Sequence, residues 1–234
     1  MDFLPTSFNY NYNTCAVVSS SPRLLNHEYG EEIDAHDAIF RVNLAPTNKY
    51  EKHVGSRTTI RIGVHISYDK SGIIPADDFL IMRFPIFPTL EEWVRNRTHL
   101  IDWYEDNQQN YPVELGYRKV YLMTLEFMKW SRECIFKRLE GKAKANPTSG
   151  YIAVQLAQLL CKSVTVYEIA ASEGKTKFCH YYDKSPMCDG NTYHRFIDER
   201  DLLEKYSLVG NVLKTGVVKL NGFNNPNFCN NSIT

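Results

Sequence analysis

Apolar residues fall in short runs along most of the chain, and stretches with helical spacing of apolar positions separate these runs. Runs of strand length that are rich in β-branched and aromatic side chains are typical of strands buried on both faces of a sheet. We predict strands at 15–20, 38–43, 58–65, 79–84, 120–124, 163–170 and 216–223. The helical spacing predicts helices at 22–34, 89–109, 126–139, 149–161 and 199–206. Buried strands that alternate with helices indicate an α/β fold with a mostly parallel central sheet flanked by helices.

No repeat and no strong linker divides the 234 residues. A chain of this length can bury one full hydrophobic core, so we predict a single domain at 13–223. We expect an irregular segment at 1–12 and an Asn-rich tail at 224–234, because chain ends are rarely held by packing.

The charges of the chain balance, since 27 Lys and Arg residues and 27 Asp and Glu residues give a formal net charge of zero. A neutral chain has no global field that attracts nucleic acid or an anionic membrane, so neither is an expected partner. The apolar run at 151–161 is too short to span a bilayer, and the first residues lack the regions of a signal peptide. No transmembrane segment is therefore expected in this sequence.

The sequence offers no pattern for a resident metal. Its six cysteines show no CxxC spacing, and that spacing leaves open whether they are free thiols or disulfides. A divalent cation that bridges a bound diphosphate needs a carboxylate pair on a loop after a strand. Asp77 and Asp78 instead precede an apolar run, where a solvated turn is the simpler interpretation.

Two predicted strand-to-helix turns carry small polar residues: SSSP at 19–22 and NPTSG at 146–150. Ligands of parallel sheets bind beyond the carboxyl ends of the strands, where the N–H groups of helix N-termini face anions. Thr148 or Ser149 can cap the following helix, and Gly150 lets a ligand approach the backbone. Taken singly, each turn is better explained as an ordinary helix cap. Neither matches GxGxxG or GxxxxGK[ST], so the common dinucleotide and nucleoside-triphosphate interpretations have no support.

His194 stands five residues ahead of Glu199, a spacing that does not place two side chains on one helical face. We predict that His194 lies just outside the helix at 199–206 and that Glu199 lies in its first turn. The positive end of a helix disfavours imidazolium, which keeps a histidine available as a base. Without further context, an ordinary loop histidine is the alternative.

Four segments, which follow one another along the chain, resemble the sialyl motifs of eukaryotic-type sialyltransferases. Residues 15–62, CAVVSSSPRLLNHEYGEEIDAHDAIFRVNLAPTNKYEKHVGSRTTIRI, resemble the large motif, and 146–170 resemble the small motif. HYYD at 180–183 looks like the third motif, and His194 with Glu199 fits the very small motif, His-x4-Glu. The resemblance implies a GT-A-like Rossmann variant. It also implies metal-independent, inverting transfer of sialic acid from CMP-sialic acid to a glycan hydroxyl.

The resemblance assigns catalytic roles to three residues. His194 is the expected general base, which removes the proton of the acceptor hydroxyl. Glu199 is expected to orient the loop that presents His194 and to take no part in proton transfer. His180 is expected to face the departing phosphate, where a protonated imidazole neutralises developing charge.

Donor binding is expected from residues at the strand ends and in the HYYD segment: Ser19, Ser20, Ser21, Asn43, Thr148, Ser149, Gly150, Tyr181 and Tyr182. Core packing is an equally good interpretation of the two tyrosines. The family usually has Gly-Asn-Ser-Gly after Cys-Ala-Val-Val, and its Asn contacts the nucleotide phosphate. Ser20 stands at that Asn position with a shorter polar group, which predicts an altered donor affinity. Arg41 and Arg57 are interpreted as structural.

The resemblance also implies how the cysteines pair and where the protein acts. In the family, the positions of Cys15 and Cys161 are bridged. A Cys179–Cys188 bridge resembles one in the α2,6-galactoside branch. The family implies the Golgi lumen, whereas a complete chain without signal or anchor predicts a soluble or cytoplasmic protein. The expected partners are CMP-sialic acid and an acceptor glycan on a glycoprotein, glycolipid or oligosaccharide.

Two other functions remain open from the sequence. The altered 19–22 turn is compatible with a catalytically weak or inactive relative that binds nucleotide or glycan. A hydrolase that uses Cys188 with His194 is disfavoured, because no third orienting group is indicated. The sequence does not identify the acceptor or the linkage, and we expect the acceptor-binding loops within 66–115 and 184–193.

Overall fold

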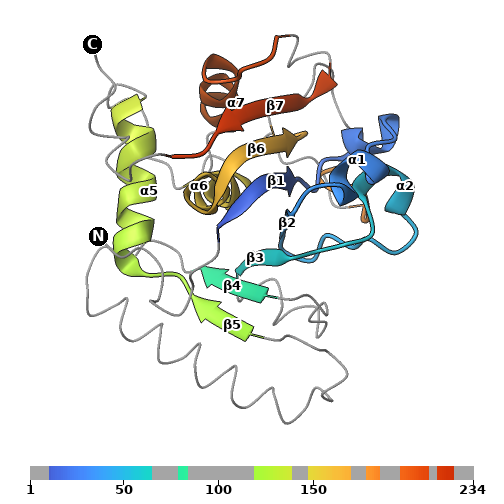
Figure 1. Cartoon of the computed structure of the whole chain (residues 1–234), viewed down its shortest axis with the longest axis horizontal. Coiled ribbons are helices and arrows are strands. Elements are labelled where there is room, and N and C mark those ends of the chain that lie inside the picture. The colour runs from blue at the N-terminus through green and yellow to red at the C-terminus, as the bar shows by residue number, and fades with distance from the viewer. Residues whose placement is uncertain are drawn as a thin grey trace.

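The computed structural model of the chain describes residues 11–64, 79–83, 119–138, 147–169, 178–184, 196–210 and 215–223. Seven strands form one sheet: β1 (Tyr12–Val18), β2 (Ala38–Val42), β3 (Ile60–Val64), β4 (Phe79–Arg83), β5 (Lys119–Leu122), β6 (Cys161–Tyr167) and β7 (Val217–Asn221). The helical elements are η1 (Pro22–Asn26), α1 (Gly30–Asp34), α2 (Glu51–Val54), α5 (Leu125–Arg138), α6 (Ser149–Leu160) and α7 (Phe196–Lys205) (Figure 1). The predicted helix at 89–109 lies outside the described residues.

The strand order is β5-β4-β3-β2-β1-β6-β7, and every neighbouring pair is parallel except β6 and β7. The prediction of an α/β fold with a mostly parallel sheet is therefore confirmed. The chain builds the sheet outward from β1 to β5 and then returns to the other side of β1 with β6. The order thus reverses between β1 and β6, and such a switch point is where α/β sheets bind ligands, beyond the carboxyl ends of the strands.

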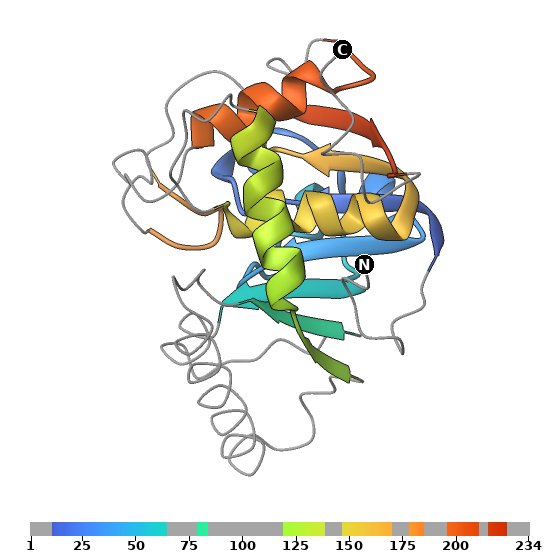
Figure 2. The ribbon, with the colours of Figure 1, turned by 90° about the vertical axis from the view of Figure 1, so that its left-hand side faces the viewer.

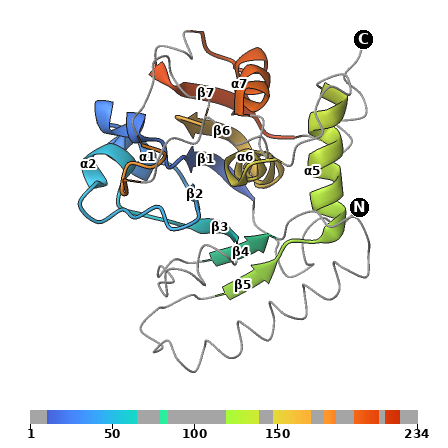
Figure 3. The ribbon, with the colours of Figure 1, turned by 180° about the vertical axis from the view of Figure 1, so that it is seen from behind.

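Both faces of the sheet are covered, which explains why its central strands are apolar throughout. Alternate residues of β1 point to opposite faces: Cys15 and Val17 pack with α5, α6 and α7, whereas Ala16 and Val18 pack on the side of η1, α1 and α2. Figure 2 shows α5, α6 and α7 together on one side of the sheet. Figure 3, the view from behind, shows α1 and α2 on the side of the molecule toward which β1 points.

One predicted helix is wrong. The stretch 22–34 forms two short pieces, η1 and α1, because His27 between them has extended backbone angles of φ −130° and ψ 158°. The carbonyl of His27 is paired with Nδ1 of the His53 ring at 2.6 Å, so a partner distant in sequence competes with the helix. The four-residue helix α2 was not predicted, since it is too short to show a period. The other elements within the described residues lie at their predicted places with shifted ends.

Two arginines lie inside the sheet, where they hold loops at its carboxyl edge. Arg41 is 1% exposed and donates hydrogen bonds to the carbonyls of Val54 and Arg57. Arg61 is 2% exposed and donates to the carbonyls of Asn43 and Ala45. A buried guanidinium is costly unless its donors are paired, and hydrogen bonds pair Nε and Nη2 of Arg41. Arg41 therefore has the structural role predicted for it.

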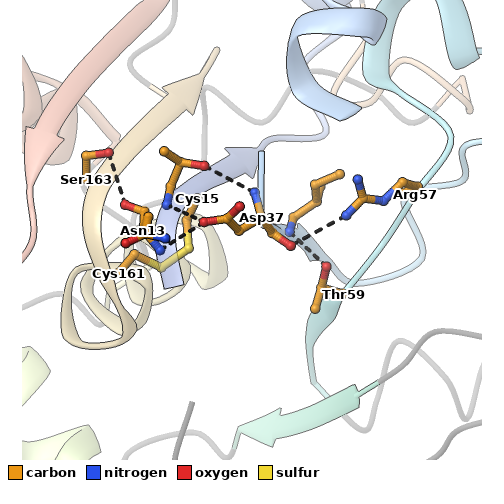
Figure 4. Close-up of a disulfide and its surroundings, with 9 residues drawn as sticks. Asn13, Cys15, Asp37, Arg57, Thr59, Cys161 and Ser163 are labelled. Atoms are coloured by element: carbon orange, nitrogen blue, oxygen red, sulfur yellow. Dashed lines mark hydrogen bonds between the residues drawn. A yellow bond between two sulfur atoms is a disulfide. The ribbon is translucent and has the colours of Figure 1, made fainter. Parts of the chain in front are cut away.

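A disulfide joins Cys15 in β1 to Cys161, which ends α6 and begins β6 (Figure 4). The two residues are 146 positions apart in the sequence, with Cα atoms separated by 6.1 Å. Both are buried. The bridge therefore ties together the two strands that flank the switch point, as the resemblance implied.

Gly30 explains how closely α1 and α2 approach each other. A Cβ atom at this position would lie 2.0 Å from the carbonyl oxygen of Glu51, which is backbone and cannot rotate away. We expect Gly30→Ala to lower the free energy of unfolding by about 2 kcal/mol, because overpacking forces the two helices apart. Urea titration followed by circular dichroism measures the change. The matched control is Gly210→Ala, since a Cβ at Gly210 meets nothing within 4 Å; equal stability of the two variants contradicts the prediction.

Candidate active site

The turn after β1 uses two of its three serine hydroxyls to fix its own shape. Ser19 Oγ accepts a hydrogen bond from the N–H of Ser21 at 3.0 Å, and Ser21 Oγ accepts one from the N–H of Arg23 at 3.3 Å. Ser21 thus caps η1, with Pro22 at the first helical position as predicted. The Ser20 hydroxyl makes no hydrogen bond within the described part of the chain. It is therefore the hydroxyl of this turn that has no part in holding the turn and is left for a ligand.

The HYYD segment is hydrogen-bonded to this turn. The N–H of Tyr181 donates to the carbonyl of Ser20 at 3.0 Å, and the Tyr181 hydroxyl donates to the carbonyl of Pro46, in the loop after β2. The Tyr181 ring is buried and packs edge-on against Tyr50. Burial raises the pKa of Tyr181, so its hydroxyl stays protonated. Tyr181 thus positions the segment by packing, the alternative that the sequence left open for it.

His180 forms a compact group with the two residues that follow Tyr181. Its Nδ1 lies 2.9 Å from Oδ2 of Asp183, and its ring stacks on Tyr182 with centroids 5.1 Å apart and planes 7° apart. The His180 and Asp183 side chains are 29% and 35% exposed. Burial, and next the charge of Asp183, raise the pKa of Tyr182 to about 12. The Tyr182 hydroxyl is therefore a hydrogen-bond donor at neutral pH.

The start of α6 is bound by a carboxylate from α7. Glu199 accepts two hydrogen bonds from Thr148: one from its N–H at 2.7 Å and one from its hydroxyl at 2.6 Å. The Thr148 oxygen in turn accepts from the N–H of Tyr151, which makes Thr148 the cap of α6. Glu199 is 4% exposed and lies in the first turn of α7, as predicted. A contact across 51 residues thus joins two segments that the sequence assigned to one site.

The Ser19–Ser21 turn and the start of α6 both adjoin the end of β6. The N–H of Ser19 donates to the carbonyl of Tyr167 at 3.1 Å. A Cβ at Gly150 would lie 3.4 Å from the Ile169 side chain, so the first turn of α6 packs on the chain just after β6. The Ser19–Ser21 turn, the HYYD segment and the start of α6 therefore meet at the carboxyl edge, beside the switch point.

Asn43 ends β2 at the same edge. It has a left-handed backbone with φ 47°, which asparagine adopts more readily than most residues. Its N–H donates to the carbonyl of Ile62, and its carbonyl accepts from Arg61 at 2.7 Å. Two neighbours on β3 thus fix the Asn43 backbone at the expected donor site.

A buried acid on the end of β6 was not found from the sequence. Glu168 is 2% exposed and has φ 55°, its N–H donates to the carbonyl of Gly216, and its carboxylate lies 3.8 Å from Nε2 of His27. Tyr29 stacks on His27 and donates to the carbonyl of Thr215. Burial, then Glu168 and Glu32, raise the pKa of Tyr29. These contacts tie the loop between η1 and α1 to the start of β7.

The remaining predicted residues lie partly outside the described part of the chain. His194 and Cys188 are both outside it, so their predicted roles stay predictions. Cys179 is disulfide-bonded, which fits the expected second bridge. Asp183, the partner of His180, was missed, although its position three residues after a histidine was a visible signal.

One cavity, of about 190 Å³, lies between α6, α7 and the end of β7. Its lining includes Gln158 near the end of α6 and Asn221, which pairs with Ser163 near the start of β6. The lining also includes Tyr151 in the first turn of α6, so the cavity follows the length of this helix, but it contains none of the predicted site residues. Its position does not add a group to the candidate site.

A parallel sheet with two small polar turns at its switch point is typical of α/β proteins that bind a ligand beyond the carboxyl ends of their strands. The model of glycosyltransferase family 29 (sialyltransferase) matches residues 3–209. This chain belongs to glycosyltransferase family 29.

Two curated relatives illustrate the similarity. The beta-galactoside alpha-2,6-sialyltransferase 2 of Xenopus tropicalis is 32% identical over 231 residues, which are 92% of this chain and 44% of the relative. Its Homo sapiens counterpart is 32% identical over 228 residues, which are 90% of this chain and 42% of the relative. The chain thus spans less than half the length of these relatives.

Solved structures support the GT-A-like Rossmann variant predicted for the fold. The crystal structure of a mammalian sialyltransferase has a TM-score of 0.56 and 24% identity, with 82% of this chain and 64% of that chain covered. A complex with Gal-beta-1-3GalNAc-ortho-nitrophenol has a TM-score of 0.55 and 25% identity, with 83% and 66% covered. Within the described residues, no helix combines the length and apolar character needed to cross a membrane.

The Glu199–Thr148 contact makes a stability prediction. We expect Glu199→Ala to lower the free energy of unfolding by about 3 kcal/mol, because two charge-assisted hydrogen bonds are lost and the cap of α6 loses its partner. Chemical denaturation measures the loss. Glu204→Ala is the matched control, since Glu204 lies on the exposed side of the same helix. If both variants unfold at the same denaturant concentration, Glu199 does not hold α6.

Proposed function

We propose that this chain is the catalytic part of a sialyltransferase, which transfers sialic acid from CMP-sialic acid to a hydroxyl group of a glycan. The observation that carries the proposal is the double hydrogen bond between Glu199 and Thr148. It holds the helix that follows His194 against the start of α6, beside the switch point. Membership of family 29 supplies the reaction class.

The donor binds at the carboxyl ends of β1 and β2 in this proposal. The Ser20 hydroxyl and Asn43 contact the cytidine monophosphate, and the first turn of α6 meets an anionic group of the donor. The Thr148 hydroxyl has a single proton, which it gives to Glu199, so it cannot donate to the donor at the same time. We therefore assign the anion contact at α6 to the backbone N–H of Gly150, since first-turn N–H groups have no acceptor within a helix.

The transfer is an in-line displacement. His194 takes the proton of the acceptor hydroxyl while its oxygen forms a bond to the anomeric carbon of sialic acid. The bond from that carbon to the phosphate oxygen breaks, and its electron pair leaves with CMP. The attack from the far side inverts the anomeric configuration. No metal is required in this scheme, because imidazolium at His180 and the N-terminus of α6 offset the charge that develops on the phosphate.

The acceptor class is proposed from the curated relatives. The names of these relatives refer to beta-galactosides and an alpha-2,6 linkage. We propose a β-galactoside acceptor and an α2,6 product for this chain. We also propose that it works in an oxidising secretory compartment such as the Golgi lumen, since the Cys15–Cys161 disulfide persists there and not in the cytosol.

The test is turnover of CMP-sialic acid by the purified, oxidised protein with lactose or a Gal-β1,3-GalNAc glycoside as acceptor. We expect CMP release that depends on acceptor, resists EDTA and gives an α2,6-linked product with inverted anomeric configuration by NMR. Binding of CMP without turnover favours the alternative of an inactive relative. Absence of both CMP binding and turnover overturns the donor assignment.

A further inference from the structure

Asp183 lies beside the expected phosphate-facing histidine, and no role has yet been given to it. Its Oδ2 is 2.9 Å from Nδ1 of His180, within ordinary hydrogen-bond distance. An ionised carboxylate can only accept, so the imidazole donates from Nδ1. A histidine that donates from one ring nitrogen presents the other, Nε2, to its surroundings.

The orientation of the His180 ring is fixed from two directions. Asp183 binds its edge, and Tyr182 stacks on its face with only 7° between the ring planes. Two such contacts allow one ring plane and one direction in that plane. Rotation of the imidazole by 180° would break the hydrogen bond and place a carbon against the carboxylate.

The group is also fixed relative to the donor turn. Tyr181 connects His180 to Tyr182, and it is tied by its N–H to Ser20 and by its hydroxyl to Pro46. The His180 ring therefore has a defined place beside the loops after β1 and β2. These are the loops to which the proposed function assigns the nucleotide.

We propose that Asp183 is a positioning residue, which accepts from Nδ1–H of His180 and so fixes the ring orientation in which Nε2 faces the phosphate of the donor. The imidazolium form keeps this bond and donates to the phosphate from Nε2. Asp183 does not contact the substrate. It acts through His180, in the same way that a carboxylate orients an imidazole in other enzyme sites. This inference rests on the proposed function and adds one residue to its machinery.

The variant that tests the proposal is Asp183→Asn. An amide can accept from Nδ1–H or donate to an unprotonated Nδ1, so the preference for one tautomer is lost at nearly equal size. We expect kcat for transfer to fall roughly tenfold to a hundredfold, the range seen when a partner that orients a histidine is removed. The donor KM should change by less than about threefold, because the phosphate charge develops in the transition state.

A spectroscopic readout separates positioning from mere folding. Long-range proton–nitrogen NMR of the His180 ring, recorded at a pH where the ring is neutral and assigned by the loss of its signals in His180→Gln, should show only the Nδ1–H tautomer in the wild type. It should show a mixture of tautomers in Asp183→Asn. Asp183→Glu, which keeps the carboxylate, should restore part of kcat. Asp201→Asn is the charge-matched control on an exposed surface of α7, and we expect wild-type behaviour from it.

Coupling between the two residues decides the outcome. If Asp183 acts through His180, adding Asp183→Asn to His180→Ala causes no further loss of kcat. An equal loss in both backgrounds, or an unchanged tautomer in Asp183→Asn, overturns the proposal. The NMR measurement needs no turnover, so it decides on Asp183 even if the wild type releases no CMP, a result that would count against the proposed function instead.

Discussion

Replacing His194 with alanine is expected to lower the rate of sialyl transfer about a thousandfold while CMP still binds. A general base contributes roughly a hundredfold to ten-thousandfold when its proton transfer occurs in the transition state. The nucleotide is bound by other segments in the proposed scheme, so its affinity should stay within about threefold of the wild type. Single-turnover transfer and calorimetric titration with CMP measure the two quantities.

The His194 variant also needs a control for folding. Glu199 anchors α7 through Thr148, and His194→Ala leaves both of these residues in place, so the unfolding midpoint of His194→Ala should match the wild type. His194→Gln restores a polar side chain but not a base, and it should be as slow as the alanine variant. A variant that retains more than about a tenth of the wild-type rate would remove His194 from the role of base.

The strands could be predicted from the sequence because their pattern is local. A strand buried on both faces has to be apolar at consecutive positions, and β2, AIFRV, is buried at all five of its residues. The same argument placed the turn after β1 at the carboxyl edge. The prediction of a strand-to-helix turn at 146–150 is wrong, because among the described elements α5 and not a strand precedes α6; the start of α6 reaches this edge because α6 leads into β6 at the opposite edge. Cys15 and Cys161 were paired by resemblance, and the structure contains that bridge.

The contacts that assemble the site could not be predicted from local pattern. Glu199 binds Thr148 across 51 residues, and His53 binds the carbonyl of His27 across 26 residues. Neither pair leaves a periodic signal, because one hydrogen bond constrains a single side chain. The second contact accompanies the break of the predicted helix at 22–34. Tertiary contacts of this kind outweigh helix propensity, which is worth under about 1 kcal/mol per residue.

The serine turn shows what sequence and structure contribute together. The sequence identifies Ser20 as a departure from the usual Asn, but it cannot rank the three serines as ligands. The hydroxyls of Ser19 and Ser21 accept hydrogen bonds from backbone N–H groups in and just after the turn, and the Ser20 carbonyl accepts one from the N–H of Tyr181. The Ser20 hydroxyl, which reaches less far than an amide, is then the one that the turn itself does not use. The altered donor affinity expected from the sequence therefore depends on the Ser20 hydroxyl.

Removing the Cys15–Cys161 bridge is expected to have the largest effect on stability. In the chain-entropy model a loop of 146 residues contributes about 5 kcal/mol, because the bridge restricts the unfolded chain. Domains are commonly stable by only about 5–15 kcal/mol, so this loss is enough to leave a large unfolded fraction at 37 °C. The double variant Cys15→Ala/Cys161→Ala tests it, since both positions are buried and alanine adds no polar group.

The second disulfide provides a matched comparison by loop length. If Cys179 pairs with Cys188, its short loop should contribute only about 2.5 kcal/mol in the same model, and Cys179→Ala/Cys188→Ala should cost about half as much stability. Urea unfolding of oxidised protein measures both variants, and dithiothreitol should lower the free energy of unfolding of the wild type below that of either variant.

Because the Cys15–Cys161 bridge spans β1 and β6, its loss should also weaken CMP binding at the turns that these strands present. An unfolding free energy of the Cys15→Ala/Cys161→Ala variant within about 1 kcal/mol of the wild type would show that packing of β1 against β6 suffices without the bond.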